Sequence, residues 1–374
     1  MTGTPPPPEP DRAPGAPHPR ETAQLIGQAQ AKAEFLDAYN SHRLHHAWLI
    51  TGPRGVGKAT LAWRIARFLL ATPKVDETGL FGDAPAVSSI NIPPEHPVAH
   101  RIHALSEPGL FLLRRPWDAK AERLRQDITV EEVRRLKGFF ALSAAGGGRR
   151  VVIVDAADEM NVNAANALLK LLEEPPADTV MLLISHQPAR LLPTILSRCR
   201  TLRCKALDAG DMARALAQIG IDPGADTEAL AALSGGSVGA AMRLISLDGL
   251  KLYAELVAIF GDRFDRPRAL RLADSVTGRA ATERLDLLLD LVDQFLGRLA
   301  RAGLSGPSNP QAAPGESLLQ QRLCPDAAAS RRWAALAQEL SARARHGRAV
   351  NLDPAALILD MVLKIHETAA LPAA

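Results

Sequence analysis

The sequence predicts an α/β protein: a parallel five-stranded sheet in the first half, a small helical domain, and an all-helical C-terminal domain. Three observations support this fold class. Short apolar segments alternate with helical segments up to Lys205, the strand signal stops at Leu207, and a glycine-rich loop directly follows the first apolar segment. Strands separated by helices are typical of a parallel sheet with helices on both faces.

The expected strands are short apolar segments: Trp48–Thr51, Leu110–Leu113, Val151–Val154, Val180–Ile184 and Thr201–Cys204. The spacing of apolar residues predicts helices from Leu61 to Leu69, from Thr129 to Phe140 and from Asn163 to Glu174. In such sheets ligands bind at the carboxyl ends of the strands.

Changes in composition divide the 374 residues into four segments. Residues 1–19 are rich in proline and predict a disordered tail. The α/β domain spans residues 20–205, the small helical domain 206–246 and the C-terminal helical domain 247–374.

The last domain contains more aliphatic residues than one core-facing helical stripe needs, above all in residues 285–299 and 355–365. We expect part of this surface to pack against other subunits, with an ordinary core of this chain as the alternative. The glycine- and proline-rich stretch from Gly303 to Gly315 predicts a loop or flexible link.

The overall composition limits the function classes. The net charge of +3 does not by itself indicate nucleic-acid binding, and the three cysteines form no disulfide framework. The sequence has neither an apolar run of membrane-spanning length nor a hydrophobic signal core. We therefore expect a cytoplasmic protein without a membrane partner.

The strongest functional motif runs from Gly52 to Thr60 and matches the phosphate-loop pattern at every fixed position except the last. The loop glycines let backbone N–H groups surround phosphate oxygens, and Lys58 contacts the outer phosphates. Ala59 stands where a hydroxyl would hold Mg²⁺, and Thr60 is rotated away by about 100°. The expected nucleotide-binding residues are Gly52, Gly55, Gly57, Lys58, Ala59, Thr60 and Asp155.

Asp155 ends an apolar strand, as the first acidic residue of the second nucleotide motif does, and we expect it to approach Mg²⁺ through water. The alternative is that Asp155 only ends the strand. Ala156 replaces the glutamate that would polarise the attacking water. The missing hydroxyl and carboxylate predict absent or very weak hydrolysis, while nucleotide binding itself stays open.

Three further segments resemble the bacterial clamp-loader subunits of the AAA+ family. They are His45–Ile50, Asn163–Pro176 and Pro193–Cys199, which carries a Ser-Arg-Cys signature. Together with the phosphate loop they cover about Ile26–Cys204 in the family's order. The resemblance implies an AAA+ domain, a helical lid and a helical collar that joins subunits into a ring.

Within this family the chain resembles the delta-prime type of DNA polymerase III subunit. Gly239 stands near the position of a lid arginine in the hydrolysing subunits, and Arg243 lies one turn later. The resemblance implies that Arg198 acts as an arginine finger on a neighbouring subunit's ATP. The alternative for Arg198 is a surface pair with a carboxylate.

The implied function is assembly in DNA replication, with little or no ATP hydrolysis by this chain. The implied partners are the gamma/tau ATPase subunits, the delta subunit and, through this hetero-oligomer, the sliding clamp and primed DNA. A competent gamma/tau-like ATPase using Thr60 is the alternative. A P-loop kinase is disfavoured by the long helical half and the Ser-Arg-Cys motif.

Subunits of this type often carry a four-cysteine zinc module between the two phosphate motifs, and this chain has no cysteine between Lys58 and Asp155. His96, His100 and His103 lie there instead. Three histidines without a thiolate or a fourth ligand predict a solvated loop, so we expect neither zinc nor a required cofactor.

Overall fold

The computed structural model describes residues 8–13, 15–22, 24–72, 86–141, 148–277 and 281–370. They form two units: the first runs to Leu207 and includes Ala217–Gly220, and the second contains Asp208–Leu216 and continues from Ile221. All the described strands lie in the first unit.

The first unit is built on a five-stranded sheet with the strand order β2-β5-β6-β1-β7, in which all neighbouring strands are parallel. Each predicted strand is confirmed to within about two residues. The strands are β1 (Ala47–Thr51), β2 (Leu110–Arg114), β5 (Arg150–Asp155), β6 (Thr179–Ser185) and β7 (Arg200–Arg203). The predicted α/β class is therefore confirmed.

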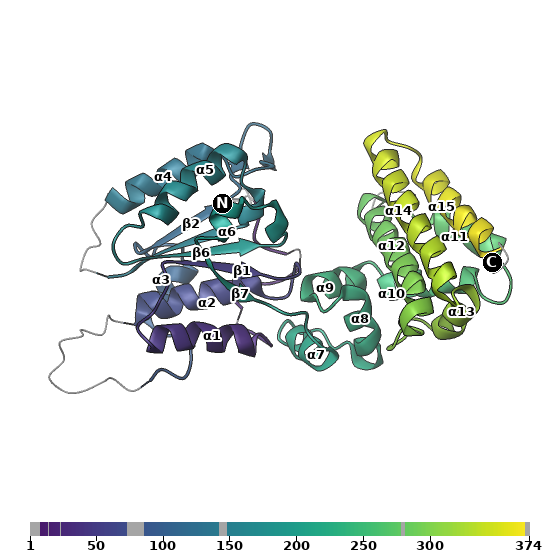
Figure 1. Ribbon diagram of the computed structural model, residues 1–374, viewed down its shortest axis with the longest axis horizontal. Helices are drawn as coiled ribbons and strands as arrows, with labels where there is room; N and C mark the ends of the chain where they lie inside the picture. Colours follow the sequence, from purple (N-terminus) through teal and green to yellow (C-terminus); the bar gives the residue numbers. More distant parts are fainter. Residues whose placement is uncertain are drawn as a thin grey trace, which may run out of the picture. The chain divides into compact units, whose positions relative to one another are not determined.

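Helices cover both faces of this sheet, as Figure 1 shows. On one face α1 and α2 pack over an apolar cluster that includes Phe35 and Trp63, and on the other α4, α5 and α6 pack over Leu136, Leu168 and Ile195. The helices are α1 (Ala29–Asn40), α2 (Lys58–Ala71), α3 (Pro97–His103), α4 (Val130–Ala141), α5 (Val162–Glu173) and α6 (Pro193–Leu196).

The register of the strands places several polar residues at one edge of the sheet. Thr51 of β1 pairs with Ser185 of β6, and Arg114 of β2 pairs with Asp155 of β5. These residues end their strands, so they share the carboxyl edge where α/β sheets bind ligands. A small antiparallel pair, β3 (Trp117–Asp118) and β4 (Arg123–Leu124), follows β2 and was not predicted from the sequence.

The second unit is helical throughout its described residues. Side chains cap two of its helices, because Ser237 and Asp353 accept hydrogen bonds from Ala240 N and Ala356 N. The helices are α7 (Ala209–Ala217), α8 (Thr227–Ser234), α9 (Val238–Ser246), α10 (Gly249–Ile259), α11 (Arg266–Asp274), α12 (Ala281–Ser305), α13 (Glu316–Leu323), α14 (Ala327–Ala349) and α15 (Pro354–Ala369). The lid helices and the later helices share this unit, and the proposed division at residues 246 and 247 stays a prediction.

Among the described helices, no single one is long and apolar enough to cross a membrane, although the bent pair Gly224–Ser234 and Val238–Ser246 has the length and composition to do so together.

The aliphatic side chains of α12 and α15 are buried within the second unit itself. In α12, Leu288, Leu291 and Val292 are 0% exposed, and in α15 Ile358 and Met361 are also 0% exposed. The structure therefore favours the ordinary core over the predicted subunit contact as the reason for these apolar residues. Leu304 of α12 and Leu363 of α15 are exceptions, at 73% and 38% exposure.

The predicted link from Gly303 to Gly315 is corrected in two respects. First, α12 continues through Gly303 to Ser305, and a Cβ on Gly303 would lie 2.2 Å from the carbonyl oxygen of Asp326, so the glycine allows this close backbone approach. Second, the loop that follows is fixed by hydrogen bonds to two buried side chains. Glu316 accepts one from Ala312 N, and Arg298 donates one to the Pro310 carbonyl.

Candidate functional site

The phosphate loop lies between β1 and α2, at the carboxyl edge of the sheet. Gly57 is the residue before α2 and has φ +97°, a conformation that favours glycine. Gly52 has φ +140°, and a Cβ there would lie 2.3 Å from the carbonyl oxygen of Cys204. The pattern glycines are therefore required by the local backbone, whether or not a phosphate is bound.

Lys58 is folded onto the loop that precedes it. Its ammonium group donates hydrogen bonds to the carbonyl oxygens of Gly52, at 2.7 Å, and Pro53, at 2.5 Å. The residue is 3% exposed, and burial lowers the pKa of Lys58 to about 8. A phosphate group bound here would compete with these two carbonyls for the ammonium.

Asp155 is buried at the end of β5, with 7% exposure. Burial, with the nearby carboxylates of Asp11 and Glu159, raises the pKa of Asp155 to about 7. Its Oδ2 atom has no hydrogen-bond partner within the part of the chain that the structure describes. Because Asp155 and Lys58 also interact electrostatically, the structure brings together the two charged groups that the sequence predicts for one site.

The end of β6 adds two polar side chains to this edge. Ser185 is 0% exposed, and neither its Oγ nor Nδ1 of His186 has a hydrogen-bond partner among the described residues. Burial and the Lys58 charge lower the pKa of His186 to about 4. Unpaired buried polar atoms are costly, so the set of Asp155, Ser185 and His186 fits a small polar ligand better than an apolar core.

The positions expected to supply hydrolysis chemistry lack the necessary groups. Ala59 packs against the apolar cluster under α2, and Thr60 is buried in the same helix. Beyond Ala156, Asp158 accepts a hydrogen bond of 2.9 Å from His186 N, and Glu159 lies 2.7 Å from Arg115. Both nearby carboxylates thus have partners of their own among the described residues.

We predicted that residues 1–19 form a disordered tail. Residues 1–7 and 14 lie outside the described residues, and for the rest of this segment the prediction is wrong. Arg114 pairs with both Glu9 and Asp11, and Nε2 of His18 lies 3.0 Å from Asp11 Oδ2. The His18 ring is 0% exposed and packs edge-on to Trp63, with ring centroids 5.6 Å apart. The proline-rich composition led to the prediction of disorder because the ion pairs of these charged side chains cannot be read from composition.

Glu9, Asp11 and His18 bring their ligand atoms within 4.8 Å of one another, as in a metal site. The geometry favours an ion network instead. Nδ1 of His18 accepts a hydrogen bond from Arg20 N, so Nε2 carries the proton and cannot bind a metal. The guanidinium groups of Arg20 and Arg114 already pair with the two carboxylates.

The three predicted solvated histidines lie at α3. His96 caps this helix by accepting a hydrogen bond from Val98 N, and His100 and His103 are exposed. Their arrangement gives no reason to assign a metal.

Arg198 follows α6, and its side chain is 35% exposed. Nη2 lies 2.9 Å from Oε1 of Glu173, and Nη1 donates a hydrogen bond of 3.0 Å to the Thr194 carbonyl. In this chain alone, Arg198 therefore makes the carboxylate pair that the sequence left as an alternative. Glu173 was not predicted as its partner, because the contact joins the end of α5 to a residue after α6 that is distant in sequence.

Gly239 and Arg243 both lie on α9. The guanidinium of Arg243 pairs with Asp290 of α12, at 2.6 Å, and also donates to the Glu283 carbonyl. Arg243 thus already has two partners within the second unit. This argues against the idea that it replaces the lid arginine of the hydrolysing subunits.

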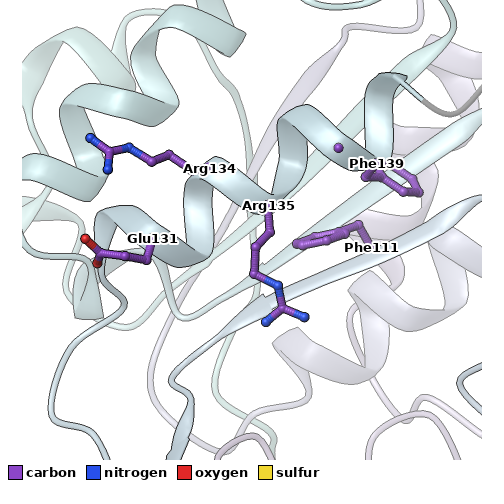
Figure 2. Close-up of a pocket in the computed structure, with 6 residues that line it drawn as sticks. Phe111, Glu131, Arg134, Arg135 and Phe139 are labelled. Carbon is purple, nitrogen blue, oxygen red and sulfur yellow. The ribbon is translucent and has the colours of Figure 1, made fainter.

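A separate shallow groove of about 650 Å³ lies between β2 and α4 (Figure 2). It contains two aromatic rings, of Phe111 and Phe139, whose centroids are 5.4 Å apart. The other lining residues are Glu131, Arg134, Arg135 and Gly138. None of them belongs to the phosphate loop or to the surroundings of Arg198, so the groove is distinct from the predicted site.

Comparison with known proteins identifies the family. A family model described as "DNA polymerase III, delta subunit" matches residues 27–208. The delta' subunit of DNA polymerase III from Pseudomonas aeruginosa is 43% identical over 203 residues, which are 53% of this chain and 55% of that protein. The chain thus spans about half the length of this relative.

Two other relatives differ in coverage. The delta' subunit of Yersinia pestis is 30% identical over 275 residues, 72% of each chain. A tau/gamma subunit of Haemophilus influenzae is 32% identical over 201 residues, 54% of this chain and 26% of that protein. With its α/β fold and these relatives, the chain belongs to the delta' family of DNA polymerase III subunits.

Proposed function

We propose that this chain is an assembly subunit of the bacterial clamp loader that donates Arg198 to a neighbouring subunit's ATP site and hydrolyses little or no ATP itself. The observation that carries the proposal is the contrast between two parts of one domain. The phosphate loop keeps Lys58 and its glycines but lacks oxygen ligands at Ala59 and Ala156, whereas Arg198 is partly exposed.

The chemistry of the two parts supports this division. Without a hydroxyl at Ala59 and a carboxylate at Ala156, Mg²⁺ and the attacking water lose their usual protein partners. A guanidinium needs no such support, because its charge is permanent and its planar fork matches phosphate oxygens. Arg198 therefore suits stabilisation of charge on a nucleotide held elsewhere.

The proposed partners are the gamma/tau ATPase subunits and the delta subunit, and through the complex the sliding clamp and primed DNA. We place the protein in the cytoplasm, as a hetero-oligomer. The helical second unit is the proposed collar, although its aliphatic residues are largely used by its own core.

The second candidate is a competent ATPase subunit of the same complex. Its support is the retained pair of Lys58 and Asp155 and the 32% identity to a tau/gamma subunit. One test separates the two candidates. Co-elution is measured after the purified chain is mixed with gamma/tau-type and delta subunits, and ATP turnover is measured for the isolated chain and for the mixture. Assembly without turnover by the isolated chain supports the first candidate, and failure to join any such complex contradicts both.

A further inference from the structure

The guanidinium of Arg198 is fixed by two contacts that use only part of its bonding capacity. One Nη atom faces the carboxylate of Glu173, and the other donates to the Thr194 carbonyl. A guanidinium has five N–H donors, so three remain after these contacts. Because the side chain is 35% exposed, an anion from outside the chain can approach it.

Both ends of this pair are attached to well-packed backbone. Glu173 is the last residue of α5, and the preceding Leu172 is 2% exposed. Ile195 of α6 is 0% exposed and belongs to the same apolar cluster, against which Cys199 also packs. The carbonyl of Leu172 contacts Nε2 of His46 at 3.0 Å, which further fixes the end of α5.

The electrostatic surroundings favour a cation at this position. The carboxylate of Glu173, the Thr194 carbonyl and the last carbonyls of α5 all carry negative charge or partial charge. Glu173 itself is 49% exposed, and ion pairs of this exposure contribute little to folding stability. The consequence of the pair is therefore geometric: it restricts the orientations of a long side chain.

We propose that Glu173 is the positioning residue of Arg198. By binding one Nη atom, Glu173 keeps the guanidinium at the end of α5 with its remaining donors available to a phosphate held by a neighbouring subunit. An arginine restricted in advance loses less conformational freedom when it meets that phosphate. This inference rests on the proposed function, since it requires Arg198 to act on another subunit.

A double-mutant cycle in the reconstituted clamp loader tests the inference. The variants are Glu173→Ala, Arg198→Ala and both together, with DNA-stimulated ATP turnover measured as kcat and KM. We expect Glu173→Ala to lower kcat by about fivefold with little change in KM. In the Arg198→Ala background the same substitution has no further effect, because the residue that it positions is gone.

Glu174 offers a matched control. It is the next residue, it is exposed, and its carboxylate makes no ion pair or hydrogen bond with the rest of the described chain. Glu174→Ala should leave kcat unchanged, and Glu173→Gln, which keeps an acceptor for Nη2, should restore most of the rate. Melting temperatures of all variants check that the fold is intact.

The outcomes separate this inference from the proposed function. The positioning role is wrong if Arg198→Ala lowers kcat but Glu173→Ala does not. It is also wrong if Glu173→Ala lowers kcat by the same factor in the Arg198→Ala background. In both cases the proposed arginine finger remains supported. If Arg198→Ala itself leaves turnover unchanged, the proposed function fails, and the positioning role with it.

Discussion

The ammonium nitrogen of Lys58 lies 2.7 Å from the carbonyl oxygen of Gly52, the first residue of its own phosphate loop. With the Pro53 carbonyl as second acceptor, the loop occupies two of the three N–H donors of the lysine, which is only 3% exposed. A nucleotide phosphate would compete with these carbonyls for the ammonium, and Ala59 offers no hydroxyl for its metal ion. These contacts of Lys58 support the proposal that the phosphate loop is retained for its structure and not for ATP hydrolysis.

The first prediction concerns turnover by the isolated chain. We expect no ATP hydrolysis above that of Lys58→Ala, because both the Mg²⁺ hydroxyl and the water-polarising carboxylate are missing. A coupled ATPase assay on the two purified proteins measures this. Turnover that Lys58→Ala abolishes would establish the competent ATPase instead.

The second prediction concerns the pH dependence of stability. The pKa of Asp155 is raised from 3.8 to about 7, mainly by burial. The folded state therefore holds this proton over a range in which the unfolded state has lost it, and stability falls as pH rises through that range. Asp155→Asn has no proton to lose in this range. We therefore expect this variant to have a free energy of unfolding a few kcal/mol higher than the unaltered protein at about pH 8, and almost the same at about pH 4.

Urea denaturation of both proteins at the two pH values measures this difference. Glu174→Gln, a change at an exposed carboxylate, is the control. An equal effect of Asp155→Asn at both pH values would show that the buried carboxyl does not titrate as described.

The third prediction concerns the buried pair of Arg298 and Glu316 in the second unit. Glu316 is 0% exposed and accepts hydrogen bonds from Arg298, Tyr253 and Ala312 N. Burial alone would raise the pKa of Glu316, but these hydrogen bonds outweigh it and hold the pKa below its usual range. Glu316→Ala leaves the Arg298 charge unpaired, and we expect it to cost about 3–5 kcal/mol.

Tyr253→Phe removes one hydrogen bond of the same network, and we expect it to cost about 1 kcal/mol. Denaturant unfolding of the two variants gives the comparison. Equal costs would mean that the charge pair does not carry the stability of the loop before α13.

The fourth prediction concerns the N-terminal segment. Arg114→Ala removes one partner each of Glu9 and of Asp11, and the Asp11 side chain is 0% exposed. We expect residues 8–20 to detach, so that trypsin cleaves at Arg12 and Arg20 about tenfold faster. Arg125→Ala, at an exposed pair with Asp118, is the control. Unchanged cleavage in Arg114→Ala would contradict the role of the ion network.

The sequence predicted the sheet and the phosphate loop because both depend on local signals. Apolar runs such as Val151–Val154 and glycine spacing at Gly52–Gly57 are properties of adjacent residues. The same reasoning located Lys58 and Asp155 at one edge, because parallel strands end together.

Contacts between distant residues were not predictable in this way. The pairs of Arg198 with Glu173 and of Arg114 with Asp11 depend on how the chain returns to the same place. Composition misled the interpretation twice. The proline content predicted disorder for the segment around His18, which packs against the first unit. The many aliphatic residues of α12 predicted a contact with another subunit, but most of them are buried in the core of the second unit.

The most direct test of the account is the DNA-stimulated ATPase rate of the reconstituted clamp loader with and without Arg198→Ala in this subunit. We predict that the variant still co-elutes with its partners but lowers the rate of the complex by about tenfold or more, as for loss of an arginine finger. A variant complex that assembles and hydrolyses ATP at the unaltered rate would contradict the account.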